Sequence, residues 1–402
     1  MQQLTSRRQV HALTVLFVCT YMVSYLTRIN YGAVISEMVT DTGFPRTLLS
    51  MAVTGSFITY GLGQVISGVL GDHISPKKLI SLGLLVTICM NLLISICRDP
   101  YQMCAVWCVN GFAQSLMWPP MVRLMTALLS QEDYKTVAAK VNWGASFGTI
   151  LVYLISPLII SFCGWRYVFV FSACAGLIML FFWLRYAYEI QPQKRVKTAA
   201  APGSNRLLLQ PLVLAIMLSI TLQGMLRDGV TTWMPTYISE VFRLDNVVSI
   251  LTGVILPLFS LLCIQAATTL YTKKLTNPLI CAAVLFSAGA AAALFLFLLE
   301  GRSAIVSVIL SALLTGCMHG VNLMLVCMVP LYFQKYGHVS TISGVINACT
   351  YVGSAISTYG IAALSASSGW STTVFIWFLI ALTGTLLCLF SARPWKQRYM
   401  QD

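Results

Sequence analysis

Two arginines lie inside long apolar segments, where a charged side chain is costly. Arg28 follows sixteen uncharged residues at 12–27 and precedes eight more at 29–36. Arg227 lies within the apolar segment 207–239. An arginine at the centre of a membrane helix costs about 2.5–3.5 kcal/mol on insertion scales, so it normally faces a water-filled cavity or a partner. The guanidinium fork matches phosphate oxygens in a bidentate manner and stays charged at physiological pH. The two residues therefore predict an anion-binding site.

The alternative interpretation is a buried ion pair, for which Asp228 is the candidate next to Arg227. Successive helical residues point about 100° apart, so we expect Asp228 not to pair readily with its neighbour. Arg28 has no carboxylate in its own segment. Two arginines match the charge of a phosphate group, about −2. A neutral sugar or a cationic drug would need neither. The pattern favours a phosphorylated ligand and leaves the ion pair as the alternative.

Two tyrosines share the helical face of Arg28. Tyr21 and Tyr25 precede it by seven and three residues, which places all three side chains on one face of a helix. Their hydroxyl groups and rings suit a polar organic ligand, but packing against another helix explains either tyrosine equally well.

The composition predicts an all-α membrane protein. Hydrophobic residues make up 58% of the chain, charged residues 9%, and the mean hydropathy is +0.81. A spanning helix needs about 20 apolar residues. The uncharged runs predict twelve transmembrane helices: 12–36, 47–71, 79–97, 101–122, 141–165, 167–184, 207–239, 246–272, 275–299, 303–334, and two within 336–392 that "SSGW" at 367–370 divides. In the fourth of these, "WPP" at 118–120 predicts a kink.

The placement of charge predicts that both termini are cytoplasmic. With both ends inside, 18 of 25 Lys and Arg residues fall in inner loops and tails, five in outer loops and two in the membrane. Acidic residues show no such bias, with five inside, six outside and one in the membrane. This is the positive-inside pattern, so the net charge of +13 orients helices and does not indicate a nucleic-acid partner. The short loops favour a bacterial inner membrane, and we expect a monomer surrounded by the lipid bilayer.

The thirteen cysteines lack metal-ligand spacing and are interpreted as small hydrophobic residues. No cleavable signal peptide is expected, because the first apolar run is too long and no small-residue cleavage site follows it. No metal and no cofactor are expected.

The chain divides into two similar halves. We predict an N-terminal six-helix bundle at 1–188, a cytoplasmic linker at 189–206, and a C-terminal six-helix bundle at 207–402. "ISE" recurs at 35–37 and 238–240, and "GW" at 164–165 and 369–370. Other matches pair Gly111, Gln114 and Gly148 with Gly316, His319 and Gly353, 205 positions on, and Arg28 with Arg227. Parallel repeats of this kind are typical of transporters whose binding site lies near the midplane between the halves.

Longer motifs resemble one transporter family. They are "YMVSYLTRINYG", "GLGQVISGVLGDHISPKKL", "NGFAQSLMWPP", "GWRYVF", "LRDGVTTWMPTYI" and "YVGSAIS". Through essentially all twelve predicted spans, the chain resembles the organophosphate:phosphate antiporters of the major facilitator superfamily. That family includes the bacterial glycerol-3-phosphate and hexose-phosphate transporters and the animal glucose-6-phosphate transporter.

The resemblance implies two six-helix bundles around a central cavity and rocker-switch exchange of an organic phosphate for inorganic phosphate. It places the phosphate-binding arginines at Arg28 and Arg227. The implied cavity residues are Tyr21, Tyr25, Tyr60, Gln64, Gln114, Trp118, Asn142 and Tyr351, to which we add His319. The implied gating residues are Gly68, Asp72 and Lys77.

Three positions depart from the family pattern. Ile29 replaces a lysine that commonly follows the first arginine, Gln64 replaces a lysine of the glycerol-3-phosphate carriers, and Ala145 stands where those carriers have a histidine. The expected site is therefore less positive than theirs. His319 either compensates in part or is a packed core histidine.

Two other functions remain open. Hexose-phosphate sensors share the resemblance, although the short tails and loops offer no evident signalling module. Another carrier of the superfamily, for carboxylates or drugs, is the second alternative, and Asp228 is the membrane carboxylate that proton coupling would use. An enzyme is not expected, because the spans hold no nucleophile–base constellation and no nucleotide-binding GxxxxGK[ST] loop.

Overall fold

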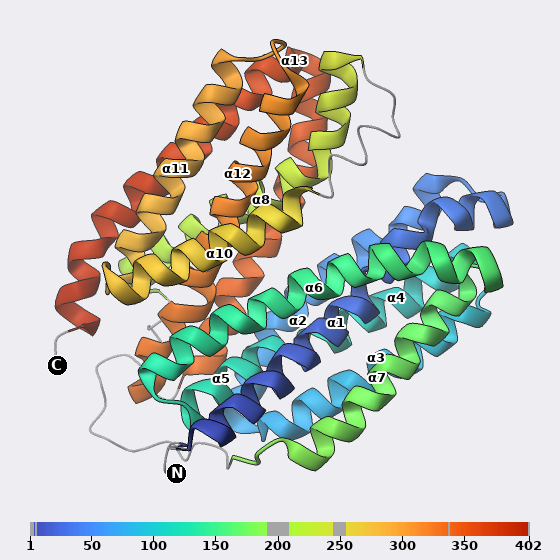
Figure 1. The fold of residues 1–402 in the computed structure, drawn as a ribbon, viewed down its shortest axis with the longest axis horizontal. Coiled ribbons are helices and arrows are strands. Elements are labelled where there is room, and N and C mark those ends of the chain that lie inside the picture. The colour runs from blue at the N-terminus through green and yellow to red at the C-terminus, as the bar shows by residue number, and fades with distance from the viewer. Residues whose placement is uncertain (1–3, 5, 191–208, 244–254, 337, 401–402) are drawn as a thin grey trace. The chain divides into compact units, whose positions relative to one another are not determined.

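All secondary-structure elements in the described residues are helices (Figure 1). The computed structural model describes residues 4, 6–190, 209–243, 255–336 and 338–400. Within these residues, eleven helices are long and apolar enough to cross a membrane. Many large apolar side chains point outward: Phe162 is 86% exposed and Phe390 is 77% exposed. Exposing these apolar side chains to water would be unfavourable, whereas the hydrocarbon core of a lipid bilayer accommodates them.

The first of two compact units contains seven helices and a later segment, residues 333–348. Its helices are α1 (Arg7–Thr42), α2 (Arg46–His73), α3 (Pro76–Ile96), α4 (Pro100–Ser115), α5 (Trp118–Leu128), α6 (Gln131–Cys163) and α7 (Arg166–Tyr186). The sequence supplies clear helix starts. Asp99 accepts the N–H of Gln102 at the start of α4, and Ser130 accepts the N–H of Asp133 at the start of α6.

The predicted span 101–122 is interrupted, and for this reason it is not among the eleven. Helix α4 ends at Ser115, and α5 begins at Trp118 with two prolines in its first turn. Proline has no N–H and is tolerated in a first turn, so the chain stops one helix and starts another. The kink predicted at "WPP" is therefore a complete break. Counted together as one crossing, α4 and α5 correspond to the predicted span 101–122 and bring the number of crossings to twelve.

The second unit contains α8 (Pro211–Phe242), α10 (Ile255–Lys273), α11 (Pro278–Leu298) and α12 (Ala304–Asn322). A π-helix, η2 (Leu323–Met328), and a 3-10 segment, η3 (Val329–Tyr336), follow α12, and η3 continues into the first unit. Element α13 (Val339–Tyr399) combines two helices that meet at Gly369, whose φ is 79°. The division predicted at "SSGW" is confirmed there. Most of the predicted linker lies outside the described residues, and the domain limits 1–188 and 207–402 stay predictions.

The "GW" repeat has the same local structure in both units. Gly164 has φ +90° and Gly369 has φ +79°, a region that favours glycine. The tryptophan that follows donates its indole N–H to a carboxylate at the end of the unit's first helix: Trp165 to Asp41 at 2.9 Å, and Trp370 to Glu240 at 2.7 Å. The repeated motif thus ties the last helix of each unit to the first.

The other repeated glycines mark close helix crossings. A Cβ on Gly148 would lie 3.0 Å from the Cβ of Tyr25 in α1, and one on Gly353 would lie 3.0 Å from the amide nitrogen of Met225 in α8. Real Cβ atoms rarely come this close, so each crossing requires glycine. The 205-residue repeat therefore records two equivalent contacts, each against the helix that carries an embedded arginine.

Candidate functional site

The guanidinium of Arg28 lies against two tyrosine rings. Its central carbon is 4.3 Å from the ring centre of Tyr25 in α1 and 4.7 Å from that of Tyr60 in α2. Both distances are within the range of cation–π attraction. The aromatic rings therefore stabilise a charge that the apolar segment would otherwise disfavour. The edge of the guanidinium carries N–H donors, which is the side that a phosphate uses.

The neighbouring aromatic side chains form one cluster with this arginine. The ring centres of Tyr21 and Tyr25 are 5.2 Å apart, and those of Tyr21 and Trp118 are 4.9 Å apart. Trp118 comes from the start of α5, so the helix break brings its indole to α1. The structure thus gathers Arg28 and four sequence-predicted cavity residues: Tyr21, Tyr25, Tyr60 and Trp118.

Gln114 is packed against α1, the helix that carries Arg28. It is 1% exposed, accepts from the hydroxyl of Ser24 at 2.7 Å, and donates to the hydroxyl of Thr27 at 2.9 Å. Both ends of its amide are therefore engaged by this helix. A role for Gln114 in a substrate cavity stays a prediction.

A set of buried asparagines, which the sequence reasoning did not include, continues this network. Asn91 of α3 and Asn110 of α4 both donate to the main-chain carbonyl of Thr27, at 3.1 and 3.2 Å. Asn30 of α1 donates to Asn91 at 2.8 Å and to the hydroxyl of Ser172 in α7 at 3.0 Å. Polar side chains within apolar spans were the signal that could have identified them, by the same reasoning that singled out the arginines.

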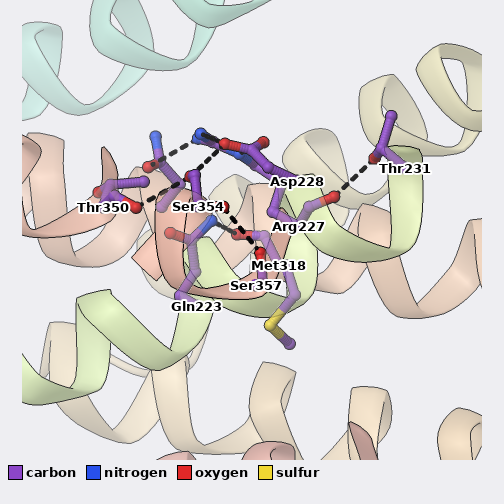
Figure 2. Close-up of polar contacts among 9 residues, drawn as sticks. Gln223, Arg227, Asp228, Thr231, Met318, Thr350, Ser354 and Ser357 are labelled. Atoms are coloured by element: carbon purple, nitrogen blue, oxygen red, sulfur yellow. Dashed lines mark hydrogen bonds and ion pairs between the residues drawn. The ribbon is translucent and has the colours of Figure 1, made fainter. Parts of the chain in front are cut away.

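Arg227 forms a bidentate ion pair with its neighbour Asp228 (Figure 2). Nε donates to Oδ1 at 2.6 Å and Nη2 donates to Oδ2 at 2.8 Å. The expectation that the two would not pair was wrong. The Cα–Cβ bonds of successive helical residues diverge by about 100°, but the arginine side chain is long enough for its guanidinium to reach the carboxylate of the next residue.

Other polar groups of the second unit surround this pair. Arg227 Nη1 donates to Asn322 Oδ1 at 3.4 Å, and the Ser354 hydroxyl donates to Asp228 Oδ2. His319 of α12 is half-buried and within electrostatic reach of both charges. Tyr351 is half-buried on α13, one turn before Ser354. Below the pair, Gln223 donates to the carbonyl of Met318 at 2.9 Å and links α8 to α12.

The π-helix η2 begins immediately after Asn322. π-Helical turns are rare and frequently occur at functional sites. Pro330 lies in η3, directly after the π-helix, and has no N–H to donate. Regular α-helical hydrogen bonding is therefore interrupted at Pro330. The irregular turn thus adjoins the side chain that contacts Arg227.

Two predicted cavity residues are engaged elsewhere in the first unit. Gln64 is fully buried and accepts from Asn347 at 3.0 Å. Asn142 is half-buried on α6, and its amide donates to the carbonyl of Ala138 at 2.9 Å, within its own helix. Of the departures from the family pattern, Ile29 is half-buried and Ala145 is buried.

Two of the three predicted gating residues meet the start of α13. Asp72 accepts the backbone N–H groups of Ser340 and Thr341, at 3.0 and 2.9 Å, and the Thr341 hydroxyl at 2.6 Å. The first N–H groups of a helix lack partners within it, and a negative charge there is favourable. A Cβ on Gly68 would lie 2.8 Å from the Ser340 carbonyl oxygen, so the same crossing requires glycine.

Lys77 lies apart from this crossing. It donates to the carbonyl of Ala187, at the end of α7, at 2.8 Å. A cation at the last carbonyls of a helix is stabilising. The structure therefore unites Gly68 and Asp72 with residues 340–344 and places Lys77 on another contact.

Comparison with known proteins identifies relatives. A probable hexose phosphate transport protein of Chlamydia trachomatis is 27% identical over 146 residues, 36% of this chain and 32% of that protein. The membrane sensor protein UhpC of Escherichia coli K12 is 23% identical over 248 residues, 56% of each chain. The human voltage-gated purine nucleotide uniporter SLC17A9 is 24% identical over 258 residues, 59% of each. The matches span about a third to just over half of each relative's length.

Solved structures and a family model agree on the fold. The E. coli fucose:proton symporter FucP matches with a TM-score of 0.77 at 13% identity, over 95% of this chain and 99% of that one. The proton:xylose symporter XylE matches with a TM-score of 0.76 at 13% identity, over 95% of each. The family model described as Major Facilitator Superfamily matches residues 17–358. The chain is an integral multi-pass membrane protein that belongs to the Major Facilitator Superfamily, a family of secondary transporters and not of enzymes.

Proposed function

We propose that this secondary transporter exchanges a phosphorylated organic metabolite for inorganic phosphate by alternating access. Arg28 and Arg227 bind the phosphate group. The observation that carries the proposal is the presence of one membrane-embedded arginine in each compact unit, at matching places in the repeat.

The surroundings of Arg28 support this proposal. The rings of Tyr25 and Tyr60 lie within cation–π distance of its guanidinium, and the N–H edge of a guanidinium is the side with which arginine binds phosphate. Relatives named for hexose phosphate and purine nucleotides also handle phosphate esters. Both substrates carry a ring beside the phosphate, which suits the aromatic cluster Tyr21, Tyr25, Tyr60 and Trp118.

The test is phosphate self-exchange in proteoliposomes loaded with labelled inorganic phosphate. Lysine keeps the charge but lacks the bidentate fork, so Arg28→Lys and Arg227→Lys should each abolish exchange. Arg185→Lys, at an exposed arginine of α7, is the matched control and should exchange normally. Near-normal exchange in either embedded variant would contradict the assignment. External hexose phosphates, glycerol phosphate and nucleotides should then be screened for release of the label.

A membrane sensor of organic phosphates is the second candidate. It is favoured by the match to UhpC, which extends over 248 residues against 146 for the hexose phosphate transport protein. The same two arginines would bind the ligand in either case. Robust phosphate counterflow by the purified protein would decide for a carrier, whereas ligand binding without counterflow would decide for a sensor.

We propose a monomer in a bacterial inner membrane with both termini cytoplasmic. The positive-inside distribution of Lys and Arg supports the orientation.

A further inference from the structure

The bidentate fork of Arg227 already holds an anion, and that anion is part of the protein. Nε and Nη2 each donate to one oxygen of Asp228, at 2.6 and 2.8 Å. These are two parallel bonds to a planar carboxylate, the arrangement with which arginine also binds phosphate. A substrate that uses this fork must therefore take the place of Asp228.

The carboxylate is also the more accessible partner. The side chain of Asp228 is 33% exposed, whereas that of Arg227 is 13% exposed. The negative charge of the pair is therefore at least as accessible as the positive charge. The Ser354 hydroxyl donates to the same carboxylate from α13, so Asp228 keeps one hydrogen-bond donor after it leaves the guanidinium (Figure 2).

The embedded arginine of the first unit has different neighbours in the sequence and in the structure. Arg28 lies within cation–π distance of the rings of Tyr25 and Tyr60, and its own apolar segment contains no carboxylate. The two arginines hold matching places in the repeat, but a carboxylate directly follows only Arg227.

We propose that Asp228 is a resident counter-ion of Arg227 which an anionic substrate must displace, and that it lowers the affinity of this fork for anions. Breaking the Arg227–Asp228 pair costs the same free energy whichever anion replaces the carboxylate, so phosphate esters and carboxylates both bind more weakly. The displaced carboxylate stays near the site and repels a phosphate ester, with its charge of up to about −2, at least as strongly as it repels a carboxylate. The inference rests on the proposed function, since it assigns the affinity of the same site.

The test compares two ligands that differ chiefly in the anionic group, glycerol phosphate and glycerate. Their dissociation constants are measured on the purified full-length protein and on Asp228→Asn. The variant should bind both ligands more tightly, by about tenfold, the factor expected when a competing charge is removed from a partly buried guanidinium. The gain for glycerol phosphate should be at least as large as the gain for glycerate. Asp228→Ser is the second neutral variant, for use if the asparagine protein does not fold.

Asp41→Asn, which removes a carboxylate at the end of α1, is the matched control and should leave both dissociation constants unchanged. Unchanged dissociation constants in the Asp228 variants would overturn the inference while leaving phosphate exchange intact. If the wild-type protein binds no phosphate ester but the Asp228 variants gain binding of both ligands, the counter-ion role stands and the proposed function fails.

Discussion

The side-chain amide of Asn110 donates to the main-chain carbonyl of Thr27 at 3.2 Å, and Thr27 directly precedes Arg28 in the chain. Asn91 donates to the same oxygen from α3, and both asparagines are fully buried. The backbone that carries Arg28 is therefore fixed by two neighbouring helices and not by α1 alone.

We expect Asn91→Ala to destabilise the protein by about 1–3 kcal/mol, because it leaves buried partners of the amide unsatisfied. Asn110→Ala should cost less, since Asn91 still reaches Thr27. Thermal unfolding in detergent measures both effects. Thr383→Ala, at an exposed threonine of α13, is the control and should be neutral. An Asn91 variant as stable as this control would show that the network does not hold α1.

The aromatic contacts of Arg28 predict a graded effect at Tyr60. Tyr60→Phe keeps a ring over the guanidinium, whereas Tyr60→Leu removes it. We expect the leucine variant to weaken phosphate binding by about fivefold, which corresponds to about 1 kcal/mol of cation–π attraction. Binding of inorganic phosphate to the purified variants checks this. Equal binding by the phenylalanine and leucine variants would exclude a role for the ring.

The carboxylate of Asp72 predicts local protection at the start of α13. Asp72→Ala removes the acceptor of the Ser340 and Thr341 N–H groups, so hydrogen exchange at these two amides should accelerate. Hydrogen–deuterium exchange with mass spectrometry resolves the segment. Glu189→Gln, at an exposed residue beside Lys78, is the control and should leave exchange at 340–341 unchanged. Unaltered protection in the Asp72 variant would contradict the helix-capping role.

Asp41 predicts a dependence of stability on pH. Hydrogen bonds from Trp165 and then Arg166 hold the pKa of this carboxyl group below its usual value of 3.8. A lowered pKa in the folded state stabilises the fold above the usual value, and this contribution is lost as the pH falls through the folded-state pKa. Wild type should therefore exceed Asp41→Asn in stability at pH 6, and the difference should shrink below about pH 4. A difference in unfolding temperature that is constant over this range would count against the contact.

We expect Gly353→Ala to cause a packing defect, and Gly360→Ala in the same element is the control. A Cβ at this position would lie 2.9 Å from the carbonyl carbon of Thr221, so Gly353→Ala should destabilise by about 1–3 kcal/mol. Gly360, in the same element, has nothing within 4 Å of an added Cβ. Gly360→Ala should be neutral or slightly stabilising, because alanine favours a helix. Similar unfolding temperatures for the two variants would refute the close crossing.

Hydropathy and proline chemistry were enough to predict most of the fold. Charge-free runs located the spans because hydrocarbon tolerates little else, and "WPP" marked the end of α4 because proline removes backbone donors. The repeated glycines Gly148 and Gly353 lie at close helix crossings in the structure, since only a missing side chain permits such approach. Residues 244–254, which contain the start of one predicted span, lie outside the described residues.

The candidate site was harder to predict, because it depends on which way side chains turn. Helical periodicity correctly grouped Tyr21 and Tyr25 with Arg28. It failed for Asp228, since the direction of a Cα–Cβ bond does not limit where a long arginine side chain ends. Gln114 bonds to Ser24 and Thr27 of the helix that carries Arg28, and no sequence pattern tells whether such an amide faces a ligand or a neighbouring helix.

The break between Ser115 and Trp118 has a consequence for membrane topology. Eleven uninterrupted crossings would leave the two ends of the chain on opposite sides of the bilayer, because an odd number of passes reverses the side. Counted as one broken crossing, α4 and α5 restore an even number. Whether the two segments separated by this break are counted as one crossing therefore determines whether a count of helices places both ends of the chain on the same side of the membrane.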